Sequence, residues 1–276
     1  EEEEGVQEEQ PGKVNRIEEV ALPSPLPESV QQAIDADVPR TRDDIPDVQR
    51  AALRRVLMAF ARFCPDVGYS QGLNHMAGVF LKLGFEEEEA FWMLAAVLED
   101  LLPLCHTGNL SGLFRDTAVA HVLLQTFLPG LVEALGAAGC QLLWFTTDYL
   151  LTLGTKDTPL PLVLRLWDFC FLYGHRAVFA GFLAHMELCF LPAAAVAARA
   201  AAEAGSGGEA DNCIEDAMAA YVAASRSADA EAYAARLAGF LHQRQGGVQD
   251  DLVCGLRAEL ALRQQQPPQP LSQLSQ

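Results

Sequence analysis

Apolar side chains recur at three- and four-residue spacing along most of this chain, and that spacing restricts its fold more than any other feature. In the segment that starts at Asp47 the recurring residues are Leu53, Val56, Leu57, Phe60 and Phe63. Such spacing places the side chains on one face of an α-helix. Similar patterns follow through the rest of the chain, and runs that alternate hydrophobic with polar residues, the signature of strands, are absent. The sequence therefore predicts an all-α, multi-helix domain without significant β-sheet.

The 276 residues, 50% of them hydrophobic, suffice for a sizeable core. Residues 1–29 are acidic and then proline-rich, and we expect them to be disordered. Residues 30–262 form the predicted helical domain, with a glycine-rich break at 205–208. The glutamine- and proline-rich tail 263–276 is again expected to be disordered.

The formal net charge of -18 argues against nucleic acid or an anionic membrane surface as the main partner. Seven dispersed cysteines without a CxxC pair indicate reduced core cysteines in a cytosolic protein. The six histidines show no metal-ligand spacing, so no metal site is expected. The apolar tract 177–198 is interrupted by His185, Glu187 and Pro192, which argues against a membrane-spanning helix.

Three short segments carry recognisable chemistry. They are Ile34-Asp-Ala-Asp-Val-Pro-Arg-Thr41, Gly68-Tyr-Ser-Gln-Gly-Leu-Asn74 and Leu164-Arg-Leu-Trp-Asp168. The arginine of the first, Arg40, offers a planar fork of positive charge that suits phosphate oxygens. The glutamine of the second, Gln71, offers an acceptor and a donor that can hold a water beside a phosphate. Transfer of the γ-phosphoryl group of GTP to water needs a positive charge beside the phosphate oxygens and a group that positions the water. It needs little covalent chemistry.

In order and spacing, the three segments resemble the motifs of the TBC-domain GTPase-activating proteins that act on Rab GTPases. The resemblance covers about residues 30–190 and implies an all-α fold. It implies that Arg40 is an arginine finger and Gln71 a glutamine finger, both inserted into a partner GTPase. It also implies that the chain has no cofactor of its own, because GTP and Mg²⁺ are carried by a Rab-family GTPase in its GTP form.

The same resemblance assigns supporting roles. Asp37 and Thr41 would hold the loop that carries the arginine. Three residues of the second motif would fix the turn that presents Gln71: Tyr69, Gly72 and Asn74. From the third motif, Trp167 and Asp168 would be internal supports of the site, and Arg165 would either pair with Asp168 or meet the GTPase.

Simpler interpretations stand beside these roles. Arg40 could pair only with Asp37 or Asp43 at the surface, and Gln71 could simply cap a helix. In many relatives a proline follows two residues after the threonine, where this chain has Asp43 within Arg42-Asp-Asp44. The two aspartates could compete for Arg40 or meet a basic patch on the GTPase. The opening helices of the family have no visible counterpart in residues 1–29.

These observations predict a GTPase-activating protein, itself not an enzyme, that regulates vesicle trafficking. The alternative is a non-catalytic TBC-like scaffold or adaptor that binds a Rab without stimulating it. The expected location is the cytoplasm, with peripheral recruitment to endomembranes through the GTPase alone. GxSxG and GxxxxGK[ST] patterns are absent, so no nucleotide site of its own is expected.

Overall fold

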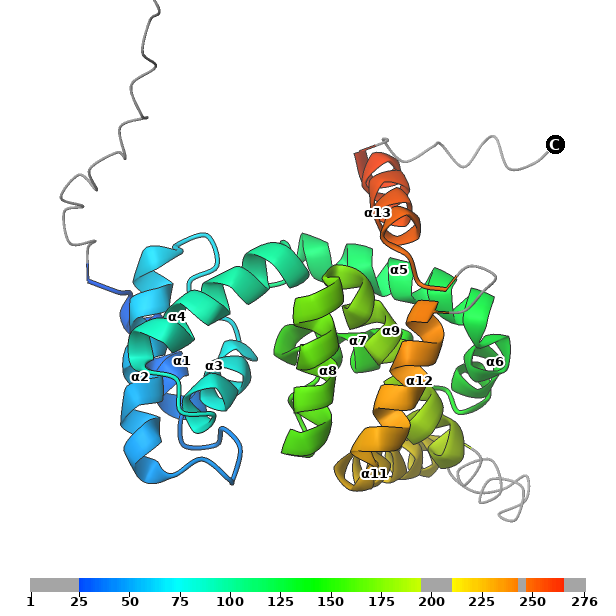
Figure 1. The fold of residues 1–276 in the computed structure, drawn as a ribbon, viewed down its shortest axis with the longest axis horizontal. Helices are drawn as coiled ribbons and strands as arrows, with labels where there is room; N and C mark the ends of the chain where they lie inside the picture. The colour runs from blue at the N-terminus through cyan, green and yellow to red at the C-terminus, as the bar shows by residue number, and fades with distance from the viewer. Residues whose placement is uncertain (1–24, 195–209, 243–246, 266–276) are drawn as a thin grey trace, which may run out of the picture.

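Helices make up all the regular structure in the residues that this computed structural model describes, which are 25–194, 210–242 and 247–265 (Figure 1). The all-α prediction is confirmed. The predicted break at 205–208 lies outside the described residues, as do residues 1–24 and 266–276 of the predicted terminal segments.

The helices follow one another in a simple order. They are α1 (Glu28–Asp37), α2 (Asp47–Phe63), α3 (Leu73–Lys82), α4 (Glu87–Ala96), α5 (Ser111–Phe127), α6 (Pro129–Ala137), α7 (Leu142–Thr152), α8 (Leu160–Tyr173), α9 (His175–His185), α11 (Ala210–Ser227), α12 (Ala230–His242) and α13 (Asp250–Gln265). Short π-helical turns extend α4 over Val97–Leu101 and α9 over Met186–Phe190. Two ends differ from the sequence prediction: α1 begins inside the segment 1–29, and α13 continues beyond residue 262.

Helices α1 to α4 pack together at one end of the molecule (Figure 1). Pro46 precedes α2 and Pro65 follows it, so the helix begins and ends where proline predicts. Four of the five residues in its apolar stripe are buried. The fifth, Phe63, is 56% exposed and stacks edge-to-face on Phe91 and Trp92 of α4.

The acidic run Glu86–Glu89 forms the start of α4. The Glu86 backbone N–H donates to the Glu89 carboxylate at 2.9 Å, and the Glu86 side chain accepts from the first turn in return. This reciprocal arrangement satisfies two of the backbone donors that a helix start leaves free. The carboxylates of Glu87 and Glu88 also lie at the positive end of the helix dipole.

At the other end of the molecule, α9 is the central helix. It contacts α5, α8, α12 and α13, and its residues 177–185 are all buried. The apolar run His175–Ala194 is long and apolar enough to cross a membrane by those measures alone. In the structure 78% of its most apolar stretch is buried by the surrounding helices, so protein atoms already cover its apolar face.

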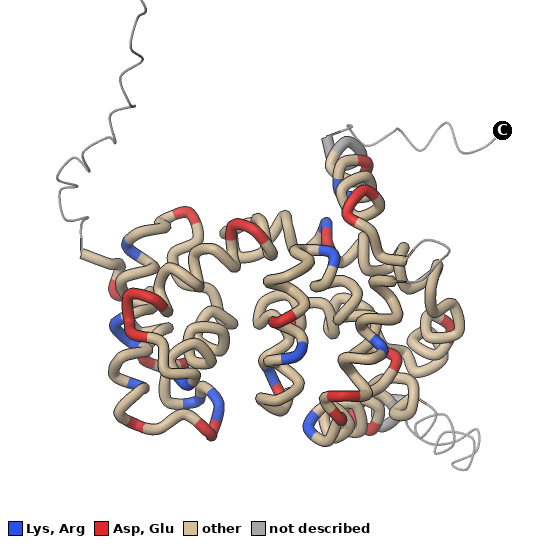
Figure 2. Tube along the Cα trace, viewed as in Figure 1, with Lys and Arg blue, Asp and Glu red and all other residues tan. Residues whose placement is uncertain are grey.

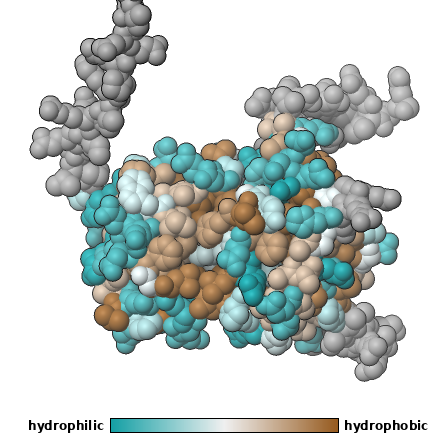
Figure 3. Space-filling model, viewed as in Figure 1, coloured by the Kyte–Doolittle hydropathy of each residue, from teal (hydrophilic) through white to brown (hydrophobic). Residues whose placement is uncertain are grey.

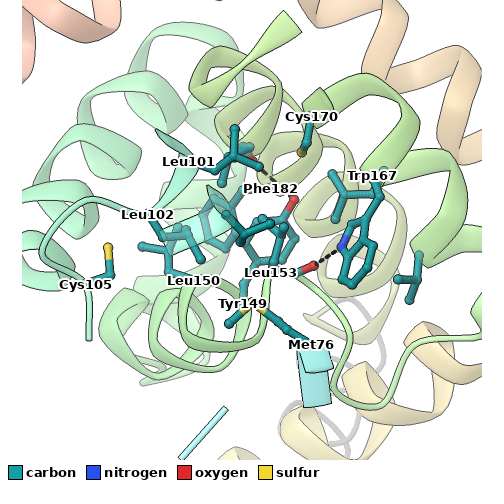
Figure 4. Packing of buried hydrophobic residues seen from close by; sticks show 14 of the residues in the cluster. Met76, Leu101, Leu102, Cys105, Tyr149, Leu150, Leu153, Trp167, Cys170 and Phe182 are labelled. Atoms are coloured by element: carbon teal, nitrogen blue, oxygen red, sulfur yellow. Dashed lines mark hydrogen bonds between the residues drawn. The ribbon is translucent and has the colours of Figure 1, made fainter. Parts of the chain in front are cut away.

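The two ends share one hydrophobic core, because α3 packs against α7 and α8. The rings of Phe80 on α3 and Trp167 on α8 have centroids 4.7 Å apart. The Trp167 indole N–H donates to the Leu153 carbonyl at 3.1 Å, and Met76 of α3 lies near the same cluster (Figure 4). A buried indole N–H needs such an acceptor. The bond therefore fixes the segment that follows α7 relative to α8.

Basic and acidic residues are interspersed along the described chain (Figure 2). Several form ion pairs between helices, such as Arg54 with Asp35 and Arg55 with Glu87. On the face in Figure 3, hydrophobic residues gather near the middle of the molecule, beside a strip of hydrophilic ones. The exposed end of α8 carries Phe171 and Leu172, whose surfaces are 49% and 72% exposed.

Candidate functional site

The first motif lies where α1 ends. Ile34, Asp37 and Thr41 are buried, whereas the side chain of Arg40 is 63% exposed. The Thr41 hydroxyl donates to the Asp37 carbonyl at 2.8 Å, and the Arg40 backbone N–H donates to the same carbonyl at 3.2 Å. These bonds close a tight turn after α1. The turn fixes the backbone at Arg40 and leaves the Arg40 side chain at the surface.

The second motif is the turn that leads into α3. Gln71 is exposed, and Gly72 follows it with φ 118°, a backbone conformation that side chains rarely allow. A Cβ atom at Gly72 would lie 2.1 Å from the Leu151 carbonyl oxygen of α7. Only glycine fits this close approach, which explains why a glycine follows Gln71. Gln71 makes no capping hydrogen bond to α3 within the described residues, so the capping interpretation is not supported.

A single carboxylate joins the two motifs. Asp37 Oδ1 accepts hydrogen bonds from the Arg40 guanidinium, with Nε at 2.7 Å, and Asp37 Oδ2 accepts from the Tyr69 hydroxyl at 2.6 Å. Burial, together with the hydrogen bond to Asp37 and its charge, raises the pKa of Tyr69 well above its usual range. Tyr69 therefore remains a hydrogen-bond donor throughout the physiological pH range. The ion pair of Arg40 with Asp37, one of the simpler interpretations of this arginine, is present.

A buried amide makes a second link between the motifs. The Asn74 Nδ2 group donates to the Thr41 hydroxyl at 2.7 Å, and Asn74 Oδ1 accepts from the Gly72 backbone N–H at 3.1 Å. Asn74 and Thr41 are 2% and 0% exposed, so each of these polar groups needs its partner. The structure thus brings together five supporting residues predicted from the sequence: Asp37, Thr41, Tyr69, Gly72 and Asn74.

Arg40 and Gln71 both line one cleft of about 580 Å³. Its first wall is the loop between α1 and α2, and its second is the start of α3. Its third wall is formed by the loop between α7 and α8 together with the last turn of α11. The residues that line it are Asp37, Arg40, Arg42, Asp43, Asp44, Gln71, Asn74, His75, Thr155, Lys156, Asp157, Thr158, Pro159 and Arg226.

The third wall was not anticipated from the sequence. The loop 155–159 carried no motif, and Arg226 lies far along the chain, where it pairs with Asp157 (Nε to Oδ1, 3.1 Å). His75 on α3 was also missed. Burial, and then the charges of Arg42 and Lys156, lower its pKa. His75 is therefore a neutral lining residue at physiological pH and adds no positive charge beside Gln71.

The two aspartates after the arginine do not compete for it. Asp44 accepts from Arg42 at 3.1 and 3.2 Å and pairs with Lys82 at 3.0 Å. Asp43 is exposed at the cleft, and the described residues contain no hydrogen-bond or ion-pair partner for its side chain. Of the two alternatives left open for these aspartates, competition for Arg40 is not what the structure shows, since Arg40 pairs with Asp37 instead.

The third motif divides into a buried and an exposed half. Trp167 is 2% exposed and supports the loop after α7 through its bond to Leu153. Asp168, in contrast, has a 70% exposed side chain, because it lies on the outer face of α8. The expectation that it is an internal support is wrong. Arg165 is also exposed, and it pairs with Glu231 at 2.7 Å and with Asp168 at 3.8 Å.

Within the described residues, no three histidine, cysteine, aspartate or glutamate side chains are grouped so that they could hold a metal ion. The charged groups of the cleft are arranged mainly as ion pairs instead. The first two motifs offer the exposed guanidinium of Arg40 and the exposed amide of Gln71, each on a turn held by hydrogen bonds. They can therefore donate hydrogen bonds to an anion and orient a water.

The comparisons with known proteins agree with the motifs. Residues 1–190 match the model of the Rab-GTPase-TBC domain family, so the match extends further toward the N-terminus than the motifs do. Human small G protein signaling modulator 3 is 39% identical over 128 residues, which are 46% of this chain and 17% of that protein. Human TBC1 domain family member 2A is 39% identical over 131 residues, 46% of this chain and 14% of that protein. The chain thus spans less than a fifth of either relative.

Two solved structures share the fold. The Chlamydomonas flagellar RabGAP TBC domain is 26% identical, with a TM-score of 0.60 over 76% of this chain and 67% of that one. The Ypt/Rab-GAP domain of Gyp1p is 15% identical, with a TM-score of 0.52 over 76% of this chain and 71% of that one, and it supports the fold alone. The match over residues 1–190 includes all three motifs, and with them Arg40 and Gln71. This chain belongs to the Rab-GTPase-TBC domain family.

Proposed function

We propose that this chain stimulates GTP hydrolysis by a Rab-family GTPase in its GTP form, with Arg40 and Gln71 supplied in trans. The observation that carries the proposal is their shared cleft: both side chains are exposed there, on turns that the Asp37–Tyr69 and Asn74–Thr41 bonds hold together. Membership of the Rab-GTPase-TBC family supports it, as does the name of the relative that refers to small G proteins.

The proposed chemistry is electrostatic. As the bond to the γ-phosphoryl group breaks, negative charge develops on phosphate oxygens, and a guanidinium placed beside them stabilises the transition state. Arg40 would serve this role after exchanging Asp37 for the phosphate. Its 63% exposure makes that exchange possible without unfolding the turn. GTP and Mg²⁺ would enter with the GTPase, since the proposal gives this chain no nucleotide site of its own.

Gln71 would orient the water that attacks the γ-phosphoryl group. Its amide can accept a hydrogen bond through the oxygen and donate one through the nitrogen at the same time, which holds a water in line. Gly72 sets the backbone that presents it, and Asn74 holds the Gly72 N–H. The backbone that carries Gln71 is therefore held in place while its side chain can move, as a residue that positions a water requires.

The alternative is a scaffold that binds a Rab without stimulating it. Such a protein needs the surface but neither exposed side chain, so the two proposals differ in the effect of single substitutions. The cell biology that follows from the first proposal is control of vesicle trafficking, with the chain brought to endomembranes by its GTPase partner.

A panel of Rab GTPases loaded with GTP would test the proposal in single-turnover hydrolysis. We expect Arg40→Ala to lower the stimulated rate by about 10³-fold or more, and Gln71→Ala to lower it strongly as well. Arg55→Ala is the matched control, because Arg55 is an exposed arginine paired with Glu87 outside the cleft lining. Thermal unfolding should show all three variants folded. Equal stimulation by wild type and both cleft variants would overturn the mechanism, and binding without stimulation by wild type would favour the scaffold.

A further inference from the structure

Arg42, one residue beyond the Arg40-Thr41 pair of the first motif, makes an unusual set of contacts. Its backbone has φ 29°, in the left-handed region that residues with side chains rarely adopt. Its side chain is only 11% exposed although it borders the cleft. A long cation that is covered to this extent must have its donors satisfied by the protein.

All three nitrogens of the Arg42 guanidinium donate hydrogen bonds. Nη1 donates to the Thr155 carbonyl at 2.8 Å and to the Thr158 carbonyl at 3.2 Å. Nε and Nη2 donate to the two carboxylate oxygens of Asp44 at 3.1 and 3.2 Å. Arg42 therefore ties its own loop to a loop more than a hundred residues away, and both carbonyls that it reaches belong to the third wall of the cleft.

Hydrogen bonds and burial fix the loop 155–159 of the third wall. The Thr155 hydroxyl donates to the Thr152 carbonyl at 2.8 Å, and Thr155 and Thr158 are 0% and 5% exposed. The start of the same loop accepts the Trp167 indole N–H at Leu153. Because α7 and α8 hold both ends of the loop, its carbonyls provide fixed points across the cleft from Arg40.

The loop that carries Arg40 is also hydrogen-bonded to α2. Arg50 of α2 donates through Nη1 to the Val38 carbonyl at 2.8 Å and to the Thr41 carbonyl at 2.9 Å. Arg50 thus fixes the loop to its own end of the molecule, whereas Arg42 fixes it to the opposite end. Among the hydrogen bonds that the described residues make to this loop, those of Arg42 span the cleft, so they can set where Arg40 lies relative to the opposite wall.

We propose that Arg42 is a positioning residue for the stimulated hydrolysis, which holds the Arg40 loop in register across the cleft through the Thr155 and Thr158 carbonyls. The inference rests on the proposed function and names a residue outside the two fingers. A direct contact of Arg42 with the GTPase is disfavoured, because its nitrogens are occupied and its side chain is largely covered.

Three substitutions separate the contributions of this residue. Arg42→Ala removes the clamp, and Arg42→Gly removes it while easing the left-handed backbone. Arg42→Lys keeps one charged donor for the two carbonyls but loses the fork to Asp44. In single-turnover hydrolysis with a responsive Rab, we expect Arg42→Ala and Arg42→Gly to lower the rate of GTP hydrolysis at saturation by about tenfold to a hundredfold. We expect the concentration of this chain that gives half of the maximal stimulation to change little. Arg42→Lys should keep part of the rate that Arg42→Ala loses.

The double variant Arg40→Ala/Arg42→Ala tests whether the residue acts through Arg40. It should be no slower than Arg40→Ala alone, because a misplaced finger cannot matter once the finger is gone. Arg55→Ala again serves as the control, and thermal unfolding should show each variant folded at the assay temperature.

Each remaining outcome is decisive. A raised half-saturating concentration with an unchanged rate would make Arg42 a contact residue and overturn the inference, as would a double variant that is additively slower. A rate equal to wild type in Arg42→Ala would overturn it while leaving the proposed function intact. Failure of the wild-type chain to stimulate any Rab would overturn the proposed function, and the inference with it.

Discussion

The Tyr69 hydroxyl donates a 2.6 Å hydrogen bond to the Asp37 carboxylate, and through it the glutamine-bearing turn holds the group that neutralises Arg40. Asp37 is 4% exposed, so water contributes little to its solvation. Its two oxygens are divided between Tyr69 and Arg40. The position of one proposed finger thus depends on the turn that presents the other.

Tyr69→Phe should weaken this coupling while leaving the ring in place. The buried Asp37 oxygen would lose its partner, which typically costs about 1–3 kcal/mol of unfolding free energy. We expect a loss of this size in urea unfolding, and a fall in stimulated hydrolysis smaller than that of Arg40→Ala. Tyr173→Phe is the matched control, since no described residue hydrogen-bonds the hydroxyl of this half-buried tyrosine. Equal stability changes for both variants would argue against the Asp37 bond.

A pair of glycines separates backbone strain from steric clash at the second motif. Gly72 and Gly84 both have positive φ, 118° and 91°. A Cβ atom added at Gly72 would lie 2.1 Å from the Leu151 carbonyl oxygen, whereas one added at Gly84 would have nothing within 4 Å. We expect Gly84→Ala to cost about 1 kcal/mol in unfolding free energy. Gly72→Ala adds a clash and should cost about 3 kcal/mol or more.

The same pair predicts different effects on activity. Stimulated hydrolysis should survive Gly84→Ala, because that glycine lies after α3, away from the cleft. It should fall sharply in Gly72→Ala, because the residue that moves is next to Gln71. If the two alanine variants have the same stability and activity, close packing on Leu151 is not what requires glycine at position 72.

Much of this architecture was predictable because its determinants are local. Helical spacing predicts the elements, and prolines mark the ends of α2. The first two motifs point to residues that meet at the cleft, since each motif needs only a few consecutive positions. The Asp37–Tyr69 and Asn74–Thr41 bonds join residues within the predicted motifs themselves.

What the sequence could not reveal depends on tertiary packing. The hydrogen bonds of Arg42 join positions separated by more than a hundred residues. Its acceptors across the cleft are backbone carbonyls, which every residue has, so residue types do not identify them. Arg226 reaches the cleft only because α11 folds back beside the loop 155–159. The family resemblance placed Asp168 inside together with Trp167, yet successive residues of a helix point about 100° apart.

The C-terminal helix α13 gives a stability prediction outside the cleft. Asp116 of α5 has a 1% exposed side chain and accepts from Arg257 of α13 through two bonds, at 2.9 and 2.6 Å. Arg115 also reaches this carboxylate, at 2.8 Å. Removing one partner of a buried pair typically costs about 3–5 kcal/mol, and since Arg115 remains, we expect Arg257→Ala to lose about 2–3 kcal/mol.

The comparison that checks it is an exposed arginine pair. Arg55 and Glu87 are 60% and 42% exposed, so water and salt screen their attraction and the pair contributes far less to stability than a buried one. Chemical denaturation of Arg257→Ala and Arg55→Ala should therefore give clearly different losses. Similar small losses would mean that α13 contributes little to the stability of the fold, and that the Asp116 carboxylate is satisfied by Arg115 alone.

Buried His106 predicts how stability changes with pH. Burial lowers its pKa from 6.5 to about 4, and neither ring nitrogen has a hydrogen-bond partner among the described residues. The unfolded chain therefore binds a proton near pH 6.5 that the folded chain refuses until about pH 4, so stability is lost as the pH falls through this window. The loss attributable to His106 should reach about 3 kcal/mol. His106→Met removes the titrating group at similar volume, so the stability of wild type minus variant should be constant above pH 7 and decrease steadily below it. A flat difference curve in urea unfolding from pH 7 to pH 4 would show that the ring is hydrated rather than buried.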